Sequence, residues 1–321
     1  MKVLVTGTSG FIGQHLATAL IDHGQEVIGL DRQQPRFPVN YVFHECDILD
    51  TAKLTRVVSA TAPHAIVHLA ARTDLGEKRD LGGYATNIEG VANLIAAIRA
   101  TPSIQRAIYT STQLVCRVGY TPSSDEDYKP ATLYGESKVE GEKIVRREDG
   151  GGVVWCIVRP TTVWGPGMNP HYQRFLRMIR NGTYVHIGRR PRMKSYGFVG
   201  NVVHQYCRIL EAPSECVLRK TFYVADYEPV SLREWADAFA GQLGVRRILT
   251  VPETIARVAA RLGDGINAVG FRNFPFNSFR LNNVLTESTF DLTETRKLCG
   301  DSPYSLEAAA AMTAEWWRHS G

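Results

Sequence analysis

Tyr134 and Lys138, four residues apart, are the two side chains of this sequence best suited to acid–base chemistry. The surrounding pattern predicts a helix over about 133–147, which places both on one helical face. A free tyrosine has a pKa of about 10 and is a poor base at neutral pH. A neighbouring ammonium group, together with the positive ring of a nicotinamide cofactor, favours the phenolate, so a lowered pKa is predicted for Tyr134. Lys138 is also expected to bond the ribose of a nicotinamide cofactor.

Two hydroxyl side chains, Ser111 and Thr112, follow an apolar run over 104–110 that is expected to be a strand. The predicted helix with Tyr134 comes next in the chain. A hydroxyl at the end of that strand can share a hydrogen bond with a substrate oxygen and hold it near the tyrosine. This arrangement indicates general acid–base catalysis coupled to hydride transfer by a bound cofactor.

A glycine-rich turn over residues 7–13 provides the expected place for that cofactor. It has the spacing G-x-x-G-x-x-G and joins an apolar run, 3–5, to a helical pattern that begins near Ile12. One glycine allows the tight turn, one admits a pyrophosphate, and one lets helix and strand pack closely. A second apolar run ends in Asp31, whose carboxylate can accept hydrogen bonds from both ribose hydroxyls. We therefore predict dinucleotide binding, with NAD preferred to NADP because Asp31 repels a 2′-phosphate.

Other residues are expected to complete the cofactor site. Asp47 follows the third predicted strand and can bond the adenine amino group; the alternative is an ordinary loop or capping carboxylate. Small side chains after the fourth strand, in Leu69-Ala70-Ala71, let a cofactor lie close to the backbone. His68 sits within an apolar run, so we expect it to pack and to make a local hydrogen bond.

The apolar runs and helical patterns alternate over the first 160 residues, which is typical of an α/β fold with a Rossmann-type, doubly wound parallel sheet. Beyond residue 168 the rhythm changes to short helices and an irregular stretch with Phe271, Phe274 and Phe276. We predict an NAD-binding domain over 1–168 with a return to it at about 195–226. A smaller, mainly helical substrate domain is expected over 169–194 and 227–321.

The composition excludes several classes of protein. The 321 residues are 44% hydrophobic and 21% charged with a net charge of +5, and no basic run interleaved with aromatics predicts nucleic-acid binding. Six scattered cysteines with no C-x-x-C pair predict neither a disulfide framework nor a zinc site, and they suit a reducing cytoplasm. The acidic run 125–127 is expected to be solvated, so no metal is predicted. No signal peptide and no run of eighteen apolar residues is seen, so we expect no membrane partner.

Taken together, the motifs resemble those of the extended short-chain dehydrogenases/reductases, in the NAD-dependent epimerase/dehydratase family typified by UDP-glucose 4-epimerase. The resemblance covers nearly the whole chain. It rests on the glycine turn and on the segments Asp47-Ile48, 68–71, Asn87-Ile88-Glu89-Gly90, Ser111-Thr112, 134–138 and 159–166. It implies that Tyr134 is the catalytic base, Lys138 its partner and Thr112 the catalytic hydroxyl. The implied cofactor-binding residues are Gly7, Gly10, Phe11, Ile12, Gly13, Asp31, Arg32, Asp47, Ile48, Leu69, Ala70, Ala71, Asn87, Ser111, Tyr134, Lys138 and Arg159.

The chain departs from the family pattern at several positions. Gln113 and Leu114 stand where family dehydratases carry Asp-Glu, so 4,6-dehydration is not expected. Cys116 stands where a tyrosine is common, and Thr162 stands where many members have a substrate-binding asparagine. Gly200-Asn201 replaces the usual acidic pair. These departures affect the expected sugar specificity, but they leave the motifs expected to bind the cofactor intact.

The resemblance further implies a nucleotide-diphosphate-sugar substrate, whose two negative charges need donors. The expected diphosphate ligand is a basic residue of the segment 189–194, which carries Arg189, Arg190, Arg192 and Lys194; Arg192 is the candidate there, and Arg280 is a second candidate, through bidentate guanidinium bonds. Thr112 and Thr162 are expected on the sugar. The leading hypothesis is an epimerase that inverts C4. Two alternatives stay open: a nucleotide-4-keto-sugar reductase, and a non-catalytic NAD-binding sensor or scaffold. A homodimer is expected through the helices around 88–98 and 133–147.

Overall fold

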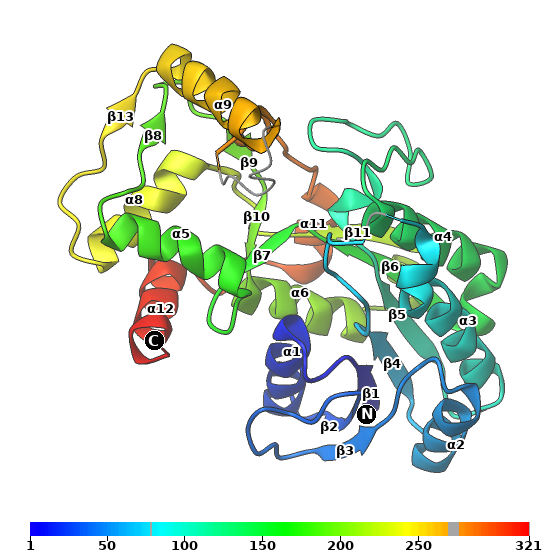
Figure 1. Ribbon diagram of the computed structural model, residues 1–321. Helices are drawn as coiled ribbons and strands as arrows, with labels where there is room; N and C mark the ends of the chain where they lie inside the picture. The colour runs from blue at the N-terminus through cyan, green and yellow to red at the C-terminus, as the bar shows by residue number, and fades with distance from the viewer. Residues whose placement is uncertain (78, 269–275, 321) are drawn as a thin grey trace.

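A parallel seven-stranded sheet forms the centre of the computed structural model, which describes residues 1–77, 79–268 and 276–320 (Figure 1). Its order is β11-β6-β5-β4-β1-β2-β3, and every neighbouring pair runs parallel. The strands are β1 (Lys2–Thr6), β2 (Glu26–Asp31), β3 (Val42–Glu45), β4 (Ala65–His68), β5 (Arg106–Thr110), β6 (Val154–Pro160) and β11 (Lys220–Val224). The predicted doubly wound sheet is therefore confirmed.

Two hydrophobic cores cover the two faces of this sheet. Successive residues of β1 alternate between them, with Val3 and Val5 in one core and Leu4 in the other. This alternation explains why the strands read as continuous apolar runs, since both faces are buried. Helices α1 (Phe11–Asp22) and α6 (Val199–Glu211) contribute to the first core; α2 (Thr51–Thr61), α3 (Ala85–Arg99) and α4 (Leu133–Arg147) contribute to or lie over the second.

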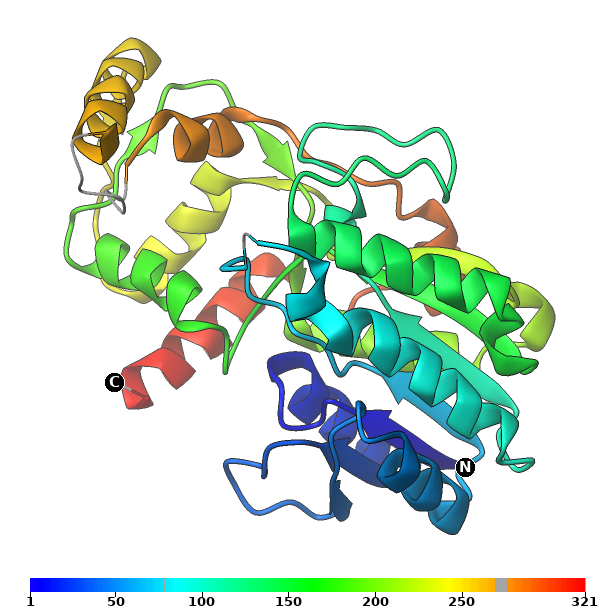
Figure 2. The ribbon, with the colours of Figure 1, turned by 45° about the vertical axis from the view of Figure 1, so that its right-hand side comes forward.

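Helices α3 and α4 lie side by side over the sheet (Figure 2). Glycine makes their close approach possible: a Cβ on Gly141 of α4 would lie 2.8 Å from the carbonyl oxygen of Asn87 in α3. The larger apolar side chains of both helices, among them Leu94 and Val145, are buried in the chain's own core. The outer side of α3 carries small or polar residues such as Ala92 and Ala96. A homodimer through these helices stays a prediction.

Most of the remaining elements form a second part beside the carboxyl ends of the strands (Figure 1). Its helices are α5 (Pro170–Arg180), α8 (Leu232–Gln242), α9 (Glu253–Ala268), α10 (Ser278–Leu285) and α12 (Leu306–His319). Its short strands are β7 (Thr162–Trp164), β8 (His186–Ile187), β9 (Met193–Lys194), β10 (Tyr196–Phe198), β12 (Val230–Ser231) and β13 (Thr250–Val251). Five short helices instead pack against the large sheet or its helices: η1 (Leu81–Tyr84), η2 (Gln113–Val115), η3 (Asp149–Gly151), α7 (Ser214–Val217) and α11 (Thr293–Cys299).

An aromatic cluster joins this second part to the sheet. Trp164 is fully buried, and its ring centroid lies 5.6 Å from that of Trp235 and 5.4 Å from that of Phe239. These residues share one hydrophobic core with β1 and α1. Between the two parts the chain returns to the large sheet through α6 and β11, within the predicted range 195–226. The domain boundaries themselves stay predictions, and Phe271 and Phe274 lie outside the described residues.

Candidate active site

A cleft of about 720 Å³ lies where the strand order reverses, between β1 and β4. This switch point is the usual ligand site of a doubly wound sheet, because the loops after neighbouring strands separate there. Most of the predicted site residues are brought together on its walls. They are Gly7, Gly10, Phe11, Ile12, Gly13, Asp31, Arg32, Asp47, Ile48, Leu69, Ala70, Ala71, Ser111, Thr112, Tyr134, Lys138 and Thr162.

The glycine turn forms a cradle that no larger residue could form. Gly7 has φ +80°, and a Cβ there would lie 2.7 Å from the amide nitrogen of Ala70. A Cβ on Gly13 would lie 2.0 Å from the Gly7 carbonyl oxygen. Gly10 precedes the first turn of α1, and it has no side chain with which to cap the helix. The amides at this helix end therefore face the cleft with their partial positive charge, which suits a pyrophosphate.

Asp31 and Asp47 line the part of the cleft where the sequence predicts the adenosine of the cofactor. The carboxylate of Asp31 accepts hydrogen bonds from the amides of Ser9 and Gln33, both at 3.0 Å. These bonds fix the carboxylate at the end of β2, beside the glycine turn. Asp47 accepts from the amide of Leu49 at 2.9 Å, so its carboxylate both shapes the loop and lines the cleft.

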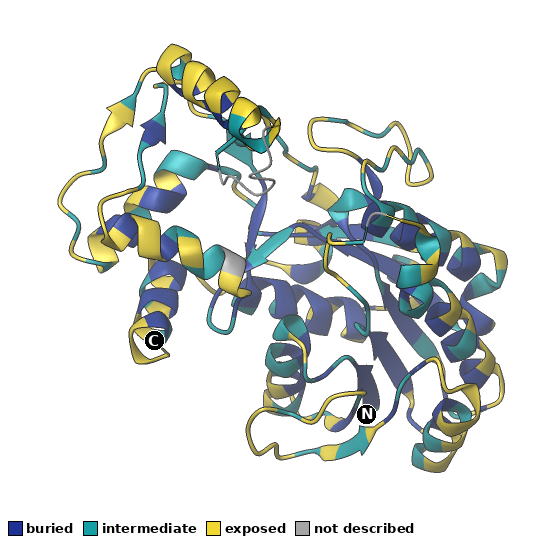
Figure 3. Cartoon of the chain, viewed as in Figure 1, coloured by how far each residue is buried: buried dark blue, intermediate teal, exposed yellow. Residues whose placement is uncertain are grey.

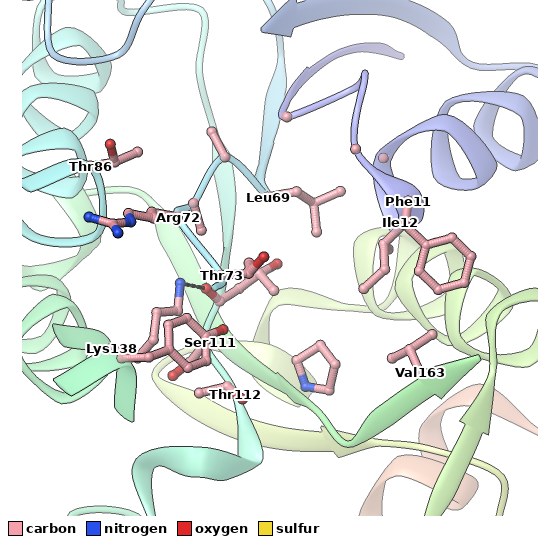
Figure 4. A pocket seen from close by; sticks show the side chains of 18 of the residues that line it. Phe11, Ile12, Leu69, Arg72, Thr73, Thr86, Ser111, Thr112, Lys138 and Val163 are labelled. Atoms are coloured by element: carbon pink, nitrogen blue, oxygen red, sulfur yellow. Dashed lines mark hydrogen bonds between the residues drawn. The ribbon is translucent and has the colours of Figure 1, made fainter. Parts of the chain in front are cut away.

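Tyr134, Lys138 and Thr112 meet at the opposite wall, where Figure 4 shows Lys138, Ser111 and Thr112 gathered across from Phe11 and Ile12. Thr132 caps α4 by accepting from the amide of Gly135 at 3.0 Å, which fixes the start of the helix. A Cβ on Gly135 would lie 2.3 Å from the carbonyl oxygen of Leu114. The glycine after Tyr134 thus allows α4 to pack directly against the segment that carries Thr112.

Burial shifts the pKa of both members of the Tyr–Lys pair. It raises the pKa of Tyr134 to about 12, an effect that a side-chain hydrogen bond with Thr112 partly offsets. It lowers the pKa of Lys138 to about 8, and the Lys138 ammonium donates to the Thr110 carbonyl oxygen at 2.6 Å. The lowered pKa predicted for Tyr134 included the positive nicotinamide ring, so it stays a prediction for the enzyme with cofactor bound. In the protein without cofactor, desolvation dominates the pKa of Tyr134.

The site residues fit a nicotinamide dinucleotide. The glycine cradle and the bare end of α1 suit a pyrophosphate, and Asp31 suits a ribose diol. Ser111 Oγ is buried and has no hydrogen-bond partner among the described residues, so its hydroxyl is available to a ligand. His68, by contrast, is held by Thr6 Oγ1 at 2.8 Å and kept neutral, because burial lowers its pKa to about 3. This agrees with the packing role expected for it.

Four predicted residues are not on the cleft wall in the part of the chain that the structure describes. Asn87 is buried beneath it and bonds the main chain of Arg72 and the hydroxyl of Ser137. Arg159 is 1% exposed, and its guanidinium makes two bonds to the Glu142 carboxylate, at 2.7 and 2.8 Å. This buried pair ties β6 to α4, the helix with Tyr134 and Lys138. The geometry gives both residues a positioning role.

Arg192 and Arg280 line a second cavity, of about 540 Å³, in the second part of the molecule. Most of its other lining residues are apolar, including Phe175, Val185, Ile187, Phe276 and Leu285. Arg192 Nη2 lies 3.5 Å from Glu253 Oε2. The buried Nε of Arg192 has no hydrogen-bond partner among the described residues. Two helices line both cavities. Tyr172 of α5 and Asn283 of α10 line the cleft. Phe175 of α5 and Val284 of α10 line the second cavity.

Several cleft residues were not singled out from the sequence. Arg72 and Thr73 follow the small residues after β4, and Thr86 precedes Asn87; these neighbours of recognised motifs could have been found by extending each motif. Gln113 donates to Thr162 Oγ1 at 3.2 Å and thereby positions a predicted substrate residue. Asn283, from α10, has no local signal, because only the fold brings it to the cleft.

Comparison with known proteins agrees with this geometry. The model of the family described as NAD dependent epimerase/dehydratase matches residues 3–225. A 3 beta-hydroxysteroid dehydrogenase/Delta 5-->4-isomerase of Mycobacterium tuberculosis is 29% identical, over 73% of this chain and 67% of that protein. A UDP-glucose 4-epimerase of Mycolicibacterium smegmatis is 27% identical, over 99% of both chains. The structure of a Thermotoga maritima UDP-glucose 4-epimerase superposes with a TM-score of 0.76 at 23% identity, covering 100% of this chain and 99% of that one, which is a likeness in fold.

Proposed function

Because the chain belongs to the NAD-dependent epimerase/dehydratase family, we propose that it is a nucleotide-diphosphate-sugar epimerase that acts at C4 and uses Tyr134 as its acid–base group. It is an NAD-dependent enzyme of the extended short-chain dehydrogenase/reductase type. The observation that supports the finer assignment is the meeting of Tyr134, Lys138 and Thr112 on the wall of a cleft whose other residues fit NAD. Retention of both Tyr134 and Lys138 argues against a non-catalytic scaffold.

Each site residue then has a defined task. When bound, NAD supplies a hydride acceptor that can return the hydride. Thr112 holds the reacting oxygen of the sugar through its hydroxyl, and Tyr134 exchanges a proton with that oxygen. In the protein alone Tyr134 is protonated at neutral pH, since its pKa is about 12, so it is ready to donate. To accept a proton it needs nearby positive charge, and Lys138, one helical turn away and still protonated at pH 7, provides some of it.

The second cavity is where we place the nucleotide. Its position on walls shared with the cleft allows one ligand to extend from Tyr134 past Asn283 to Arg280. Arg192, with its unpartnered buried Nε among the described residues, is proposed to contact the diphosphate together with Arg280. Bidentate bonds to phosphate are the strongest that a guanidinium makes. The apolar lining would then hold the base.

The test is to incubate the purified protein with a panel of nucleotide sugars and no added cofactor, and to identify products by chromatography and NMR. We expect the C4 epimer of one sugar in many-fold excess over the NAD that co-purifies. The Tyr134→Phe variant, with its ring intact, is the matched control and should form little product. Product that appears only with stoichiometric NADH or NADPH would contradict an epimerase and indicate the reductase. No turnover of any sugar would contradict both.

A second candidate is an NAD-dependent hydroxy dehydrogenase or ketoreductase for an apolar substrate. It is favoured by the mostly apolar wall of the second cavity and by the similarity to the steroid dehydrogenase. The same Tyr134 and Lys138 would serve the reaction, but the cofactor would leave reduced or oxidised after each turnover. Stoichiometric reduction of NAD with an apolar secondary alcohol, and none with nucleotide sugars, would establish this candidate in place of the epimerase.

A further inference from the structure

Helix α9 buries small side chains and exposes large apolar ones, the opposite of the usual arrangement in a surface helix. Its buried side consists of small residues, Ala256, Ala260 and Gly263. Ala256 and Ala260 form a minor hydrophobic cluster with Leu281 of α10. Its large apolar side chains, Ile255, Val258 and Leu262, are 58%, 58% and 66% exposed. A helix of a monomeric globular domain normally buries the large side chains and leaves the small or polar ones outside. Packing among the described residues therefore gives no reason for the exposed side.

The three exposed residues form one continuous stripe. Their spacing of three and four places them on a single helical face, and Figure 3 shows this helix at the edge of the molecule, far from the large sheet. Leu249, which is 64% exposed, precedes the helix by four residues. We call Leu249, Ile255, Val258 and Leu262 the α9 stripe.

Arginines accompany the α9 stripe. Arg246, Arg247, Arg257 and Arg261 are all exposed, whereas the segment 246–268 contains two acidic residues, Glu253 and Asp264. Glu253 already pairs with Arg257 at 2.7 Å and with Arg192 at 3.5 Å. The segment therefore carries a net positive charge beside its apolar side chains. A second copy of this chain would have to bring acidic groups to this surface, but the net charge of the chain is itself positive, +5.

We propose that the α9 stripe is a docking surface for an anionic lipid bilayer, on which α9 lies flat with its apolar side chains at the acyl boundary. An amphipathic helix with basic residues beside its apolar face is the form that interfacial membrane binding takes. Arginines near an anionic leaflet add an electrostatic attraction. None of the described helices is long and apolar enough to span a bilayer, and a surface-bound helix need not be. The sequence prediction of no membrane partner considered only spanning segments.

The first test is co-sedimentation of the full chain with vesicles. We expect it to pellet with vesicles of 30% phosphatidylglycerol in phosphatidylcholine at low salt, and far less with phosphatidylcholine alone or at high salt. A Val258→Ser/Leu262→Ser variant should partition at least about tenfold less, since two large side chains no longer leave water. Arg246→Gln/Arg261→Gln should lose about fivefold per arginine. Both changes are at exposed positions, and circular dichroism checks the fold.

The matched control is Phe37→Ser, an equally exposed apolar side chain in the loop between β2 and β3, at the far end of the molecule from α9. It should bind vesicles as the unaltered chain does. Equal pelleting of the stripe variant and the unaltered chain would overturn the proposal, as would no pelleting at all. So would light scattering that shows a dimer lost in the stripe variant with no vesicle binding, because α9 would then be an interface between copies.

Discussion

The two walls of the cleft are built in different ways. The wall from the large sheet is built around a turn of main chain and glycines, held so closely that a Cβ on Gly13 would lie 2.0 Å from the Gly7 carbonyl oxygen. The wall from the second part consists of longer side chains from separate elements, such as Tyr172 of α5 and Asn283 of α10. Backbone geometry suits one invariant ligand, the dinucleotide, whereas dispersed side chains suit a substrate that differs between relatives. The predictions below test this division.

The largest effect is expected at Gly13. Gly13→Val places atoms where the Gly7 carbonyl oxygen lies, so the turn must open and NAD affinity should fall at least about 100-fold. Gly241→Ala in α8 is the matched control, because its Cβ would meet no atom within 4 Å. It should leave the NAD dissociation constant, measured by calorimetry, unchanged. Tight NAD binding by the Gly13 variant would show that the sheet wall is not the cofactor wall.

The next prediction concerns Lys138, which is expected to bond the nicotinamide ribose. Its pKa of about 8 means that the side chain is charged below pH 8 and loses its charge as pH rises through 8. NAD affinity should therefore be higher at pH 6.5 than at pH 9.5. Lys138→Ala should weaken NAD binding and turnover together, and Lys138→Arg should remove the pH dependence, since arginine stays charged. If the NAD affinity of Lys138→Arg still depends on pH as in the unaltered chain, a group other than Lys138 causes the pH dependence.

A stability effect is expected from the buried pair that ties α4 to β6. Glu142→Gln leaves the Arg159 guanidinium, 1% exposed, without its counter-charge and should lower the free energy of unfolding by about 3 kcal/mol or more. Glu140→Gln, on the same helix, breaks only a half-exposed pair with Lys143 and should cost less than about 1 kcal/mol. Urea denaturation measures both. Equal costs would mean that the pair does not brace the catalytic helix.

The smallest effect is expected at Asp31. Asp31→Ala removes the carboxylate that repels a 2′-phosphate. Arg32, the next residue on the cleft wall, stays in place and can bind that phosphate. The preference for NAD over NADP should fall by about fivefold, since two unit charges about 4 Å apart interact by about 1 kcal/mol in water. Calorimetry with both dinucleotides checks this. Tighter binding of NADP by the unaltered chain would contradict the assignment of Asp31.

The sheet wall could be predicted from the sequence because each of its features is local. The glycine turn, Asp31 and the Tyr134–Lys138 pair are each set by a short motif in one strand–helix unit. The second wall could not, because Asn283 reaches the cleft only through the fold. The effect of burial on the pKa of Tyr134 could not be predicted for a related reason, since desolvation depends on residues far apart in the chain. Arg159 belongs to a recognised motif, yet its partner Glu142 could be identified only from the structure.

Turnover by Tyr134→Phe is the most direct test of the central claim, that Tyr134 performs acid–base chemistry beside bound NAD. The change removes one oxygen and keeps the ring, whose centroid lies 6.1 Å from that of the Tyr84 ring. The fold and the NAD affinity should therefore be preserved. On the substrate that the unaltered enzyme converts, kcat should fall by about 10²-fold or more. Near-normal kcat in a variant that still binds NAD would contradict the account.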